Sequence, residues 1–202
     1  LSGLKLVLGG NVFGWTADET QSFAVLDAYA AAGGNFVDTA DVYAAWVPGN
    51  SGGESETILG RWMAARGNRD RIVVATKVGK LPGLSGLSAK TIRAAAEGSL
   101  RRLGTDRIDL YYAHADDPAT PLEETLCAFD ALVREGKVRA IAASNYTAER
   151  LSEALDVSKR LGLARFEALQ PHYNLVHRRE YEGELAGVCE REGLSCFPYY
   201  AL

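Results

Sequence analysis

Hydrophobic and polar positions divide this chain into two kinds of segment that alternate from end to end. Short runs are almost entirely apolar, and between them lie longer stretches in which apolar residues recur every three or four positions. The short runs predict buried β-strands, and the longer stretches predict helices with one buried face. In chain order, the predicted strands are 4–10, 35–39, 71–77, 108–114, 138–144, 166–170 and 195–200.

Capping residues and glycines predict where the helices begin and end. Thr16 and Glu19 match the pattern of a capping box for the first helix, which Gly33 and Gly34 end. A second helix is predicted around residues 58–63 and ends at Gly67, and a third lies between Ser88 and Gly104. The fourth is capped by Thr120, with Pro121 and Glu123 in its first turn, and ends at Gly136. A fifth follows Thr147, and a sixth runs through Leu185 to Gly193. The stretch 46–53 between strands is predicted to be a loop.

This alternation predicts a parallel sheet covered by helices. Two architectures share the pattern, the open doubly wound sheet and the (β/α)8 barrel. The turn after the first strand reads GGNVFGW, which does not match the GxGxxG of dinucleotide-binding open sheets. We therefore predict an α/β protein with a (β/α)8 TIM-barrel fold. Residues 1–202 would form a single domain, incomplete at the C-terminus, with the eighth β/α unit missing from this chain.

Composition narrows the function classes. The chain has 202 residues and a formal net charge of −4, which argues against a nucleic-acid partner. No apolar run approaches the roughly 20 residues that span a membrane, and LSGLKLVLGG at the N-terminus lacks the pattern of a signal peptide. Cys127, Cys189 and Cys196 form no CxxC, which favours reduced, packed thiols in a cytoplasmic protein. The aliphatic helix faces suit an oligomer as well as a core, so the oligomeric state stays open.

Polar residues end nearly every predicted strand. In a barrel the C-terminal ends of the strands meet at one face, so these side chains should share one site. A single lysine or histidine at a strand end is more often a surface or core residue, but the alignment of a whole set on one rim favours function. In chain order the set is Asp38 with Tyr43, Lys77, His114, Ser144 with Asn145, Gln170, and Tyr199 with Tyr200.

Four of these residues form a coherent set for carbonyl chemistry. A buried Lys77 ammonium beside the Tyr43 phenol would lower the pKa of that phenol from its usual value of about 10. Asp38 would keep Lys77 charged, and His114 would orient the substrate oxygen or share its proton. Such a site predicts delivery of a hydride to a carbonyl carbon, which requires a nicotinamide cofactor.

Four further residues suit that cofactor. Ser144, Asn145 and Gln170 offer hydroxyl and amide groups for a carboxamide, and Tyr199 offers a ring face for stacking. Asp41, between Asp38 and Tyr43, is interpreted as a solvated or structural loop acid.

The chain also resembles the aldo-keto reductase superfamily over nearly its whole length. The resemblance is carried, in order, by GGNFVDTADVY, ATKVG, SLRRLGTDRIDLYYAH, GKVRAIAASNY, LQPHYNL and PYYAL. It implies a (β/α)8 barrel that binds NADPH, with NADH as the alternative, and that reduces a small aldehyde or ketone reversibly. It also implies that the family continues beyond PYYAL into an eighth strand and the basic residues that bind the 2′-phosphate, so we expect weak or absent cofactor binding by the 202-residue polypeptide alone.

The resemblance assigns roles to individual residues. The catalytic tetrad would be Asp38, Tyr43, Lys77 and His114, with Tyr43 as the acid. The resemblance implies cofactor contacts at Gly9, Gly10, Ser144, Asn145, Gln170 and Tyr199, and a substrate pocket that includes Trp46 and Asp116.

Three alternative functions are compatible with parts of this pattern. A metal-dependent barrel hydrolase would need a cluster of ligands, but His114, His172 and His177 show no HxH or HExxH spacing, so no metal is predicted. A nucleophilic Ser144 lacks the GxSxG context. A non-catalytic subunit that binds a cofactor, resembling the β subunits of potassium channels, would keep the fold and the cofactor. Turnover that depends on Tyr43 would separate the enzyme from such a subunit.

Overall fold

A computed structural model describes residues 6–201 of the chain. Residues 4 and 5 of the predicted strand 4–10 lie outside the described residues, as does the first half of the N-terminal stretch LSGLKLVLGG. Seven parallel strands form one sheet, in the order β1-β2-β3-β6-β7-β8-β9. Their bounds are β1 Leu8–Gly9, β2 Phe36–Asp38, β3 Val73–Val78, β6 Ile108–Ala113, β7 Val138–Ser144, β8 Phe166–Gln170 and β9 Ser195–Cys196.

Six α-helices connect these strands within the described residues. They are α1 Glu19–Ala31, α2 Glu54–Arg66, α3 Ala89–Leu103, α4 Leu122–Arg134, α5 Ala148–Leu161 and α6 Glu184–Glu192. A short antiparallel hairpin, β4 Lys80–Leu81 with β5 Leu84–Ser85, follows β3. A 3-10 turn, Arg69–Arg71, precedes β3.

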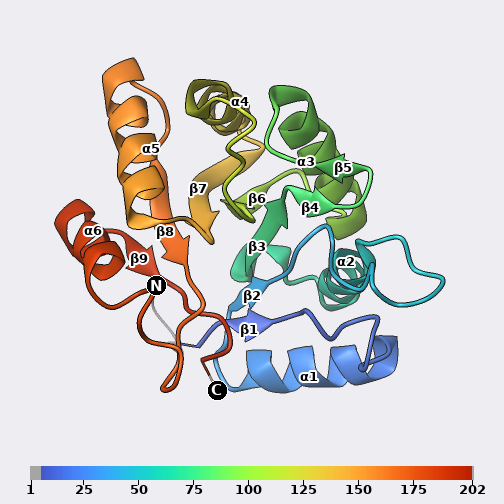
Figure 1. The fold of residues 1–202 in the computed structure, drawn as a ribbon. Coiled ribbons are helices and arrows are strands. Elements are labelled where there is room, and N and C mark those ends of the chain that lie inside the picture. Colours follow the sequence, from blue (N-terminus) through green and yellow to red (C-terminus); the bar gives the residue numbers. More distant parts are fainter. Residues whose placement is uncertain (1–5, 202) are drawn as a thin grey trace.

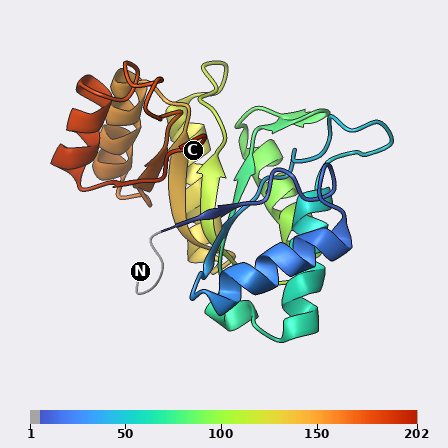
Figure 2. The ribbon, with the colours of Figure 1, turned by 90° about the horizontal axis from the view of Figure 1, so that it is seen from below.

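The sheet curves as a barrel wall does. Every strand lies beside its neighbour in sequence, whereas a doubly wound sheet reverses its strand order. Figure 1 shows the strands around a common centre with the helices outside them. In Figure 2 the strands run through the middle, with α5 and α6 on one side and α1 and α2 on the other. The predicted barrel fold is confirmed, and residues 6–201 supply seven of its eight strands. That residues 1–202 form one domain stays a prediction.

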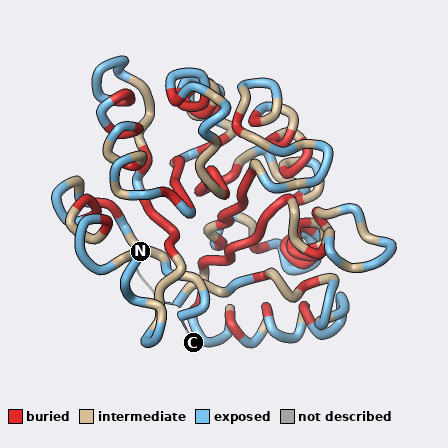
Figure 3. The backbone as a smooth tube through the Cα atoms, in the orientation of Figure 1, coloured by how far each residue is buried: buried red, intermediate tan, exposed pale blue. Residues whose placement is uncertain are grey.

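Alternate strand residues face two separate cores. Residues on the outer face of the sheet, such as Val74 and Tyr111, pack against the helices in one large cluster with Trp62. Residues on the inner face form a smaller cluster inside the barrel, which includes Phe36 and Tyr112. Figure 3 shows the result: the strands are buried, and exposed positions lie on the outer sides of the helices. On β3 this alternation turns residue 77 toward the interior of the barrel.

Several predicted helix ends are confirmed. Ser88 and Thr147 cap α3 and α5 with their side chains, and the helices α2, α3 and α6 end at Gly67, Gly104 and Gly193 in the left-handed conformation.

The predicted capping box of the first helix is wrong. Asp18, not Thr16, caps α1. Its side chain accepts from the backbone amide of Gln21 at 2.8 Å, and the side chain of Gln21 accepts from the backbone amide of Asp18 at 3.0 Å. The helix starts later because residues 12–17 form a turn, in which the backbone amide of Ala17 donates to the carbonyl of Val12.

The predicted cap of α4 is also wrong. Thr120 donates its hydroxyl to Asp117 at 2.7 Å instead of capping the helix. Pro121 occupies the N-cap position without a side-chain hydrogen bond, so the expected box with Glu123 does not form.

Two further expectations need correction. The last predicted strand is shorter than 195–200: only Ser195–Cys196 pairs with β8, while Tyr199 makes an isolated bridge to His172. Of the three cysteines, all of them free, Cys127 is exposed rather than packed.

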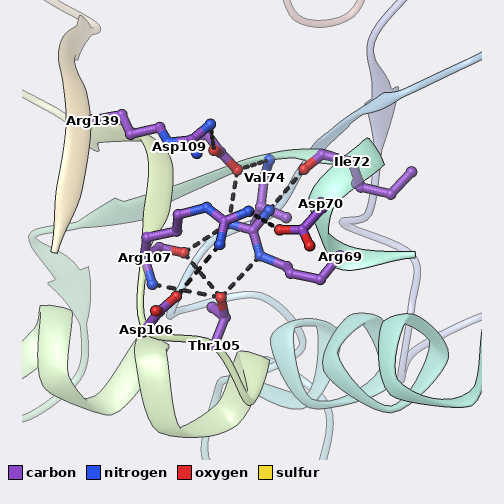
Figure 4. A network of polar contacts seen from close by, with 9 residues as sticks. All are labelled: Arg69, Asp70, Ile72, Val74, Thr105, Asp106, Arg107, Asp109 and Arg139. Carbon is purple, nitrogen blue, oxygen red and sulfur yellow. Dashed lines mark hydrogen bonds and ion pairs between the residues drawn. The ribbon is translucent and has the colours of Figure 1, made fainter. Parts of the chain in front are cut away.

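A polar network joins the N-terminal ends of β3 and β6, at the opposite end of these strands from Lys77 and His114 (Figure 4). Arg69 contacts the Asp109 carboxylate at 2.8 Å and donates to the carbonyls of Ile72 and Arg107. The same Asp109 oxygen accepts the backbone amide of Val74 at 2.9 Å. The network supplies partners for backbone groups at the start of both strands, so its role is structural.

We expect Arg69→Met to lower the free energy of unfolding by about 3 kcal/mol, because the substitution leaves Asp109 buried without its main cation. Arg139→Met is the matched control. Arg139 contacts the same carboxylate at 3.0 Å, but its side chain is 62% exposed, so its loss should cost below about 1 kcal/mol. Urea unfolding curves of both variants measure the difference. Equal, small losses would contradict a structural role for Arg69.

Candidate active site

Lys77 lies at the centre of the candidate site. Its side chain is 1% exposed, and its ammonium donates three hydrogen bonds. The acceptors are Asp38 Oδ2 at 2.6 Å, the Thr39 carbonyl at 2.8 Å and Tyr43 Oη at 2.9 Å. An ammonium has three N–H groups, so all its donors are used. The structure therefore brings together three of the four predicted tetrad residues in direct contact.

The contact follows from how the chain leaves β2. Asp38 pairs with Ala75 at the last position of β2. Beyond it the backbone amide of Thr39 still donates to the carbonyl of Ala75, and that of Asp41 donates to the carbonyl of Lys77. The loop therefore stays against β3 for several more residues. This path delivers Tyr43 to the end of the Lys77 side chain.

Burial sets the charge states of this group. Burial raises the pKa of Tyr43, and the nearby Lys77 only partly offsets the effect. The expectation that Lys77 would bring the pKa of Tyr43 below its usual value is therefore wrong for the free protein. Burial alone would lower the pKa of Lys77, but the Asp38 carboxylate and Tyr43 raise it overall. At neutral pH Tyr43 is protonated and Lys77 is charged.

His114 completes the set from the end of β6. Its ring centroid lies 6.2 Å from that of Tyr43, at an interplanar angle of 77°. Burial, together with the charges of Lys77 and Lys80, lowers the pKa of His114 to about 2. The imidazole is therefore neutral at physiological pH. Its Nδ1 has no hydrogen-bond partner within residues 6–201, so His114 can serve as a hydrogen-bonding group but not as a charged acid.

The predicted cofactor residues form one connected group. Ser144 donates its hydroxyl to the carbonyl of Gln170 at 3.0 Å. Asn145 donates to the carbonyl of His114 at 2.8 Å and accepts from the Tyr199 hydroxyl at 2.8 Å. Asn145 has a φ of 56°, a left-handed conformation that asparagine tolerates better than most residues. The ends of β7, β8 and β9 thus meet beside the tetrad.

The two glycines at the end of β1, Gly9 and Gly10, differ in their surroundings. A Cβ on Gly10 would lie 3.0 Å from Ser55 Oγ and 3.1 Å from Phe13, while the amide of Gly10 donates to the carbonyl of Asp38 at 2.8 Å. Close packing of this turn therefore disfavours a side chain at residue 10. Gly9 has more room, since its nearest neighbour would lie at 3.8 Å. A cofactor contact at either glycine stays a prediction.

The two predicted substrate residues have different surroundings. Asp116 is held by Arg150 through two hydrogen bonds, of 2.9 and 3.0 Å, so its carboxylate is already engaged. Trp46 is 48% exposed and packs edge-on against Tyr43, with ring centroids 6.2 Å apart. Trp15, which the sequence analysis did not select, packs against Trp46 at 5.6 Å. Its position in the turn after the first strand was the available signal.

Two classes of feature are not found within residues 6–201. No helix there is long and apolar enough to cross a membrane. No group of three or more His, Cys, Asp or Glu side chains is arranged to hold a metal ion.

Comparison with known proteins agrees with this arrangement. Residues 5–202 match the sequence profile described as "Aldo/keto reductase family". The chain is 37% identical over 222 residues to norsolorinic acid reductase stcV of Emericella nidulans, an alignment that covers 100% of this chain and 55% of the relative. It is 34% identical over 200 residues to an aryl-alcohol dehydrogenase (NADP+) of Phanerodontia chrysosporium, covering 93% of this chain and 50% of the relative.

The chain spans about half the length of the curated relatives that it matches. Within that half, the profile match, the identities and the strand order all agree. The chain belongs to the aldo/keto reductase family.

Proposed function

We propose that the protein containing this chain reduces an aldehyde or ketone to an alcohol reversibly, with NADPH as cofactor and Tyr43 as general acid. The observation that carries the proposal is the bond from Lys77 to Tyr43 Oη, 2.9 Å long. Since the phenol oxygen accepts from Lys77, its own hydrogen is left to be donated to a substrate oxygen. Family membership supports the reaction class.

Each remaining tetrad residue has a distinct proposed task. Lys77 stabilises the phenolate that Tyr43 becomes once its proton has been given to the substrate. Asp38 keeps Lys77 charged and in place through their 2.6 Å contact. The neutral imidazole of His114 orients the carbonyl oxygen by a hydrogen bond. Because Lys77 and Asp38 are buried, these electrostatic effects are weakly screened by water.

The donor set beside the tetrad fits a nicotinamide. A carboxamide needs both a donor and an acceptor from the protein, and the side-chain amide of Gln170 carries both. Asn145 offers a lone pair of its Oδ1, because its amide nitrogen already donates to the His114 carbonyl and to Ser144 Oγ. The ring of Tyr199 lies next to Asn145 for stacking. When bound, the reduced nicotinamide supplies the hydride. The preference for NADPH over NADH is supported by the NADP+ in the name of one relative.

We infer that the substrates are aromatic carbonyl compounds. Trp15 and Trp46 are each about half exposed, and their ring pair adjoins Tyr43. Aromatic faces at a site entrance favour flat aromatic ligands. The names of the relatives, norsolorinic acid reductase and aryl-alcohol dehydrogenase, are in keeping with this choice.

The test is NADPH oxidation by the full-length protein with benzaldehyde and, in parallel, with butanal. We expect one alcohol formed for each NADPH consumed, and a higher kcat/KM for the aromatic aldehyde because it can contact Trp46. Equal values for the two aldehydes would contradict the aromatic preference alone. NADPH binding without turnover of any carbonyl compound would contradict the enzymatic proposal and favour a non-catalytic, cofactor-binding subunit.

A further inference from the structure

Asp41 is a buried carboxyl group in the loop that carries Tyr43. It follows Asp38 by three residues, and its residue exposure is 0%. Neither of its carboxyl oxygens has a hydrogen-bond partner within the described part of the chain. Of the two sequence interpretations of Asp41, a solvated or a structural loop acid, the solvated acid is therefore wrong. A buried carboxylate without partners is costly, so this side chain needs an explanation.

The loop after residue 50 closes over Asp41. A Cβ on Gly52 would lie 2.8 Å from the carbonyl oxygen of Asp41. On the opposite side, the backbone amide of Asp41 donates to the carbonyl of Lys77 at 3.3 Å. Asp41 is thus held between the loop after residue 50 and β3. Because Asp41 has no exposed surface, water reaches its side chain only if residues 39–43 or the loop after residue 50 move.

The charged and titratable groups that act on Asp41 come from four elements. They are Glu56 on α2, Lys77 on β3, Arg102 on α3 and Tyr111 on β6.

Neither cation in this group donates a hydrogen bond to Asp41. Arg102 Nε donates to Glu56 Oε2 at 2.6 Å, and all three donors of Lys77 go to other acceptors. The Tyr111 hydroxyl is itself buried without a partner among residues 6–201. A charge on Asp41 would therefore be poorly compensated.

Burial and, secondly, the charge of Glu56 raise the pKa of Asp41 to about 7. The folded protein thus holds a proton on this group well above the usual range of an aspartic acid. The geometry and the charges agree: the site accommodates a neutral carboxylic acid better than a carboxylate.

We propose that Asp41 is a positioning residue that acts in its neutral form: its proton lets residues 39–43 pack against β3 with Tyr43 on Lys77, and loss of the proton drives this loop outward. The proposal rests on the proposed role of Tyr43. Tyr43 lies two residues beyond Asp41, so hydration of an Asp41 carboxylate would shift the phenol away from the Lys77 ammonium. The consequence is a site that weakens as pH rises through neutrality.

The sign of the effect on stability follows from linkage. Between the ordinary aspartate pKa of 3.8 and about 7, the folded state binds more protons than the unfolded state. Stability therefore falls as pH rises through this window and is level above it. Asn is neutral at every pH and has nearly the same shape, so Asp41→Asn should remove this dependence.

The experiment compares the full-length protein with its Asp41→Asn variant from about pH 5 to about pH 8.5. We expect the Tm of the parent to fall relative to that of the variant by roughly 5 °C or more across this range. We also expect kcat of the parent to decline through neutrality, while the variant keeps the low-pH kcat of the parent and shows no such decline.

Parallel pH curves for the parent and Asp41→Asn, in Tm or in kcat, would overturn the proposal. If the Asn variant fails to fold, infrared spectroscopy of the parent decides. A carboxylic-acid C=O band that is present at about pH 6 and lost by about pH 8.5 supports the proposal, and its absence overturns it. The Tm and infrared measurements need no turnover. They therefore test the proposal for Asp41 even if the protein reduces no carbonyl compound, a result that would contradict only the proposed function.

Discussion

Tyr43→Phe is expected to lower kcat for carbonyl reduction by roughly two orders of magnitude or more, the usual consequence of removing an essential general acid. The substitution deletes one oxygen, the acceptor of the 2.9 Å bond from Lys77. The Phe ring can keep the edge-on contact with Trp46, so the fold and the affinity for NADPH should change little. The measurements are steady-state turnover of an aromatic aldehyde and a fluorescence titration with NADPH.

Tyr146→Phe is the matched control for Tyr43→Phe. Tyr146 is also largely buried, with its ring 5.6 Å from that of Phe166, but its hydroxyl has no partner among the described residues. Loss of this hydroxyl should leave kcat unchanged. Turnover at the parent rate by Tyr43→Phe would remove Tyr43 from the proposed mechanism. Loss of activity in both variants would point to a general disturbance of the barrel.

The second large effect is expected at Lys77. Lys77→Met removes the only described cation in contact with Asp38, which is buried and whose second oxygen already lacks a partner. Breaking a buried pair from one side costs about 3–5 kcal/mol of unfolding free energy. The same substitution should reduce turnover at least as strongly as Tyr43→Phe, because the phenolate loses its stabilising charge.

A double variant separates the two consequences of losing Lys77. Asp38→Asn together with Lys77→Met removes both members of this buried pair and leaves no unpaired charge there, so most of the lost stability should return while activity stays absent. Denaturant unfolding and turnover measure the two properties. The pKa of Lys77 is raised above 10.5, so its contribution to stability should be constant over the neutral range and disappear only at strongly alkaline pH. A single-variant loss below about 1 kcal/mol would contradict a structural role for the pair.

Local sequence signals predicted much of the fold. The apolar runs identified all seven strands of the sheet, and their order along the chain identified the barrel. Helices begin after Ser88 and Thr147 as predicted, and both side chains cap, because such a cap needs only a side chain and an amide three residues away. Thr16 and Thr120 have the same local pattern and do not cap. A turn held by the backbone and the contact with Asp117 are formed there instead.

The candidate site residues show the same contrast between local and long-range information. The strand-end pattern was sufficient to select Asp38, Tyr43 and Lys77, because parallel strands bring their C-terminal ends to one rim. It could not show that Asp116 is held by Arg150, a contact between residues 34 positions apart. It also could not show that Trp15 reaches Trp46 across 31 positions.

By itself the sequence determined the order of elements, the barrel class and the residues that meet at its rim. These depend on periodicity, on helix ends and on the geometry of parallel strands, all of which are local or follow from topology. Only the tertiary structure decided the charge states. Burial keeps Tyr43 protonated and His114 neutral. It also places Asp41 where a charge would be desolvated and poorly compensated by Arg102 and Lys77. Desolvation depends on every segment packed around a group, and no stretch of sequence contains that information.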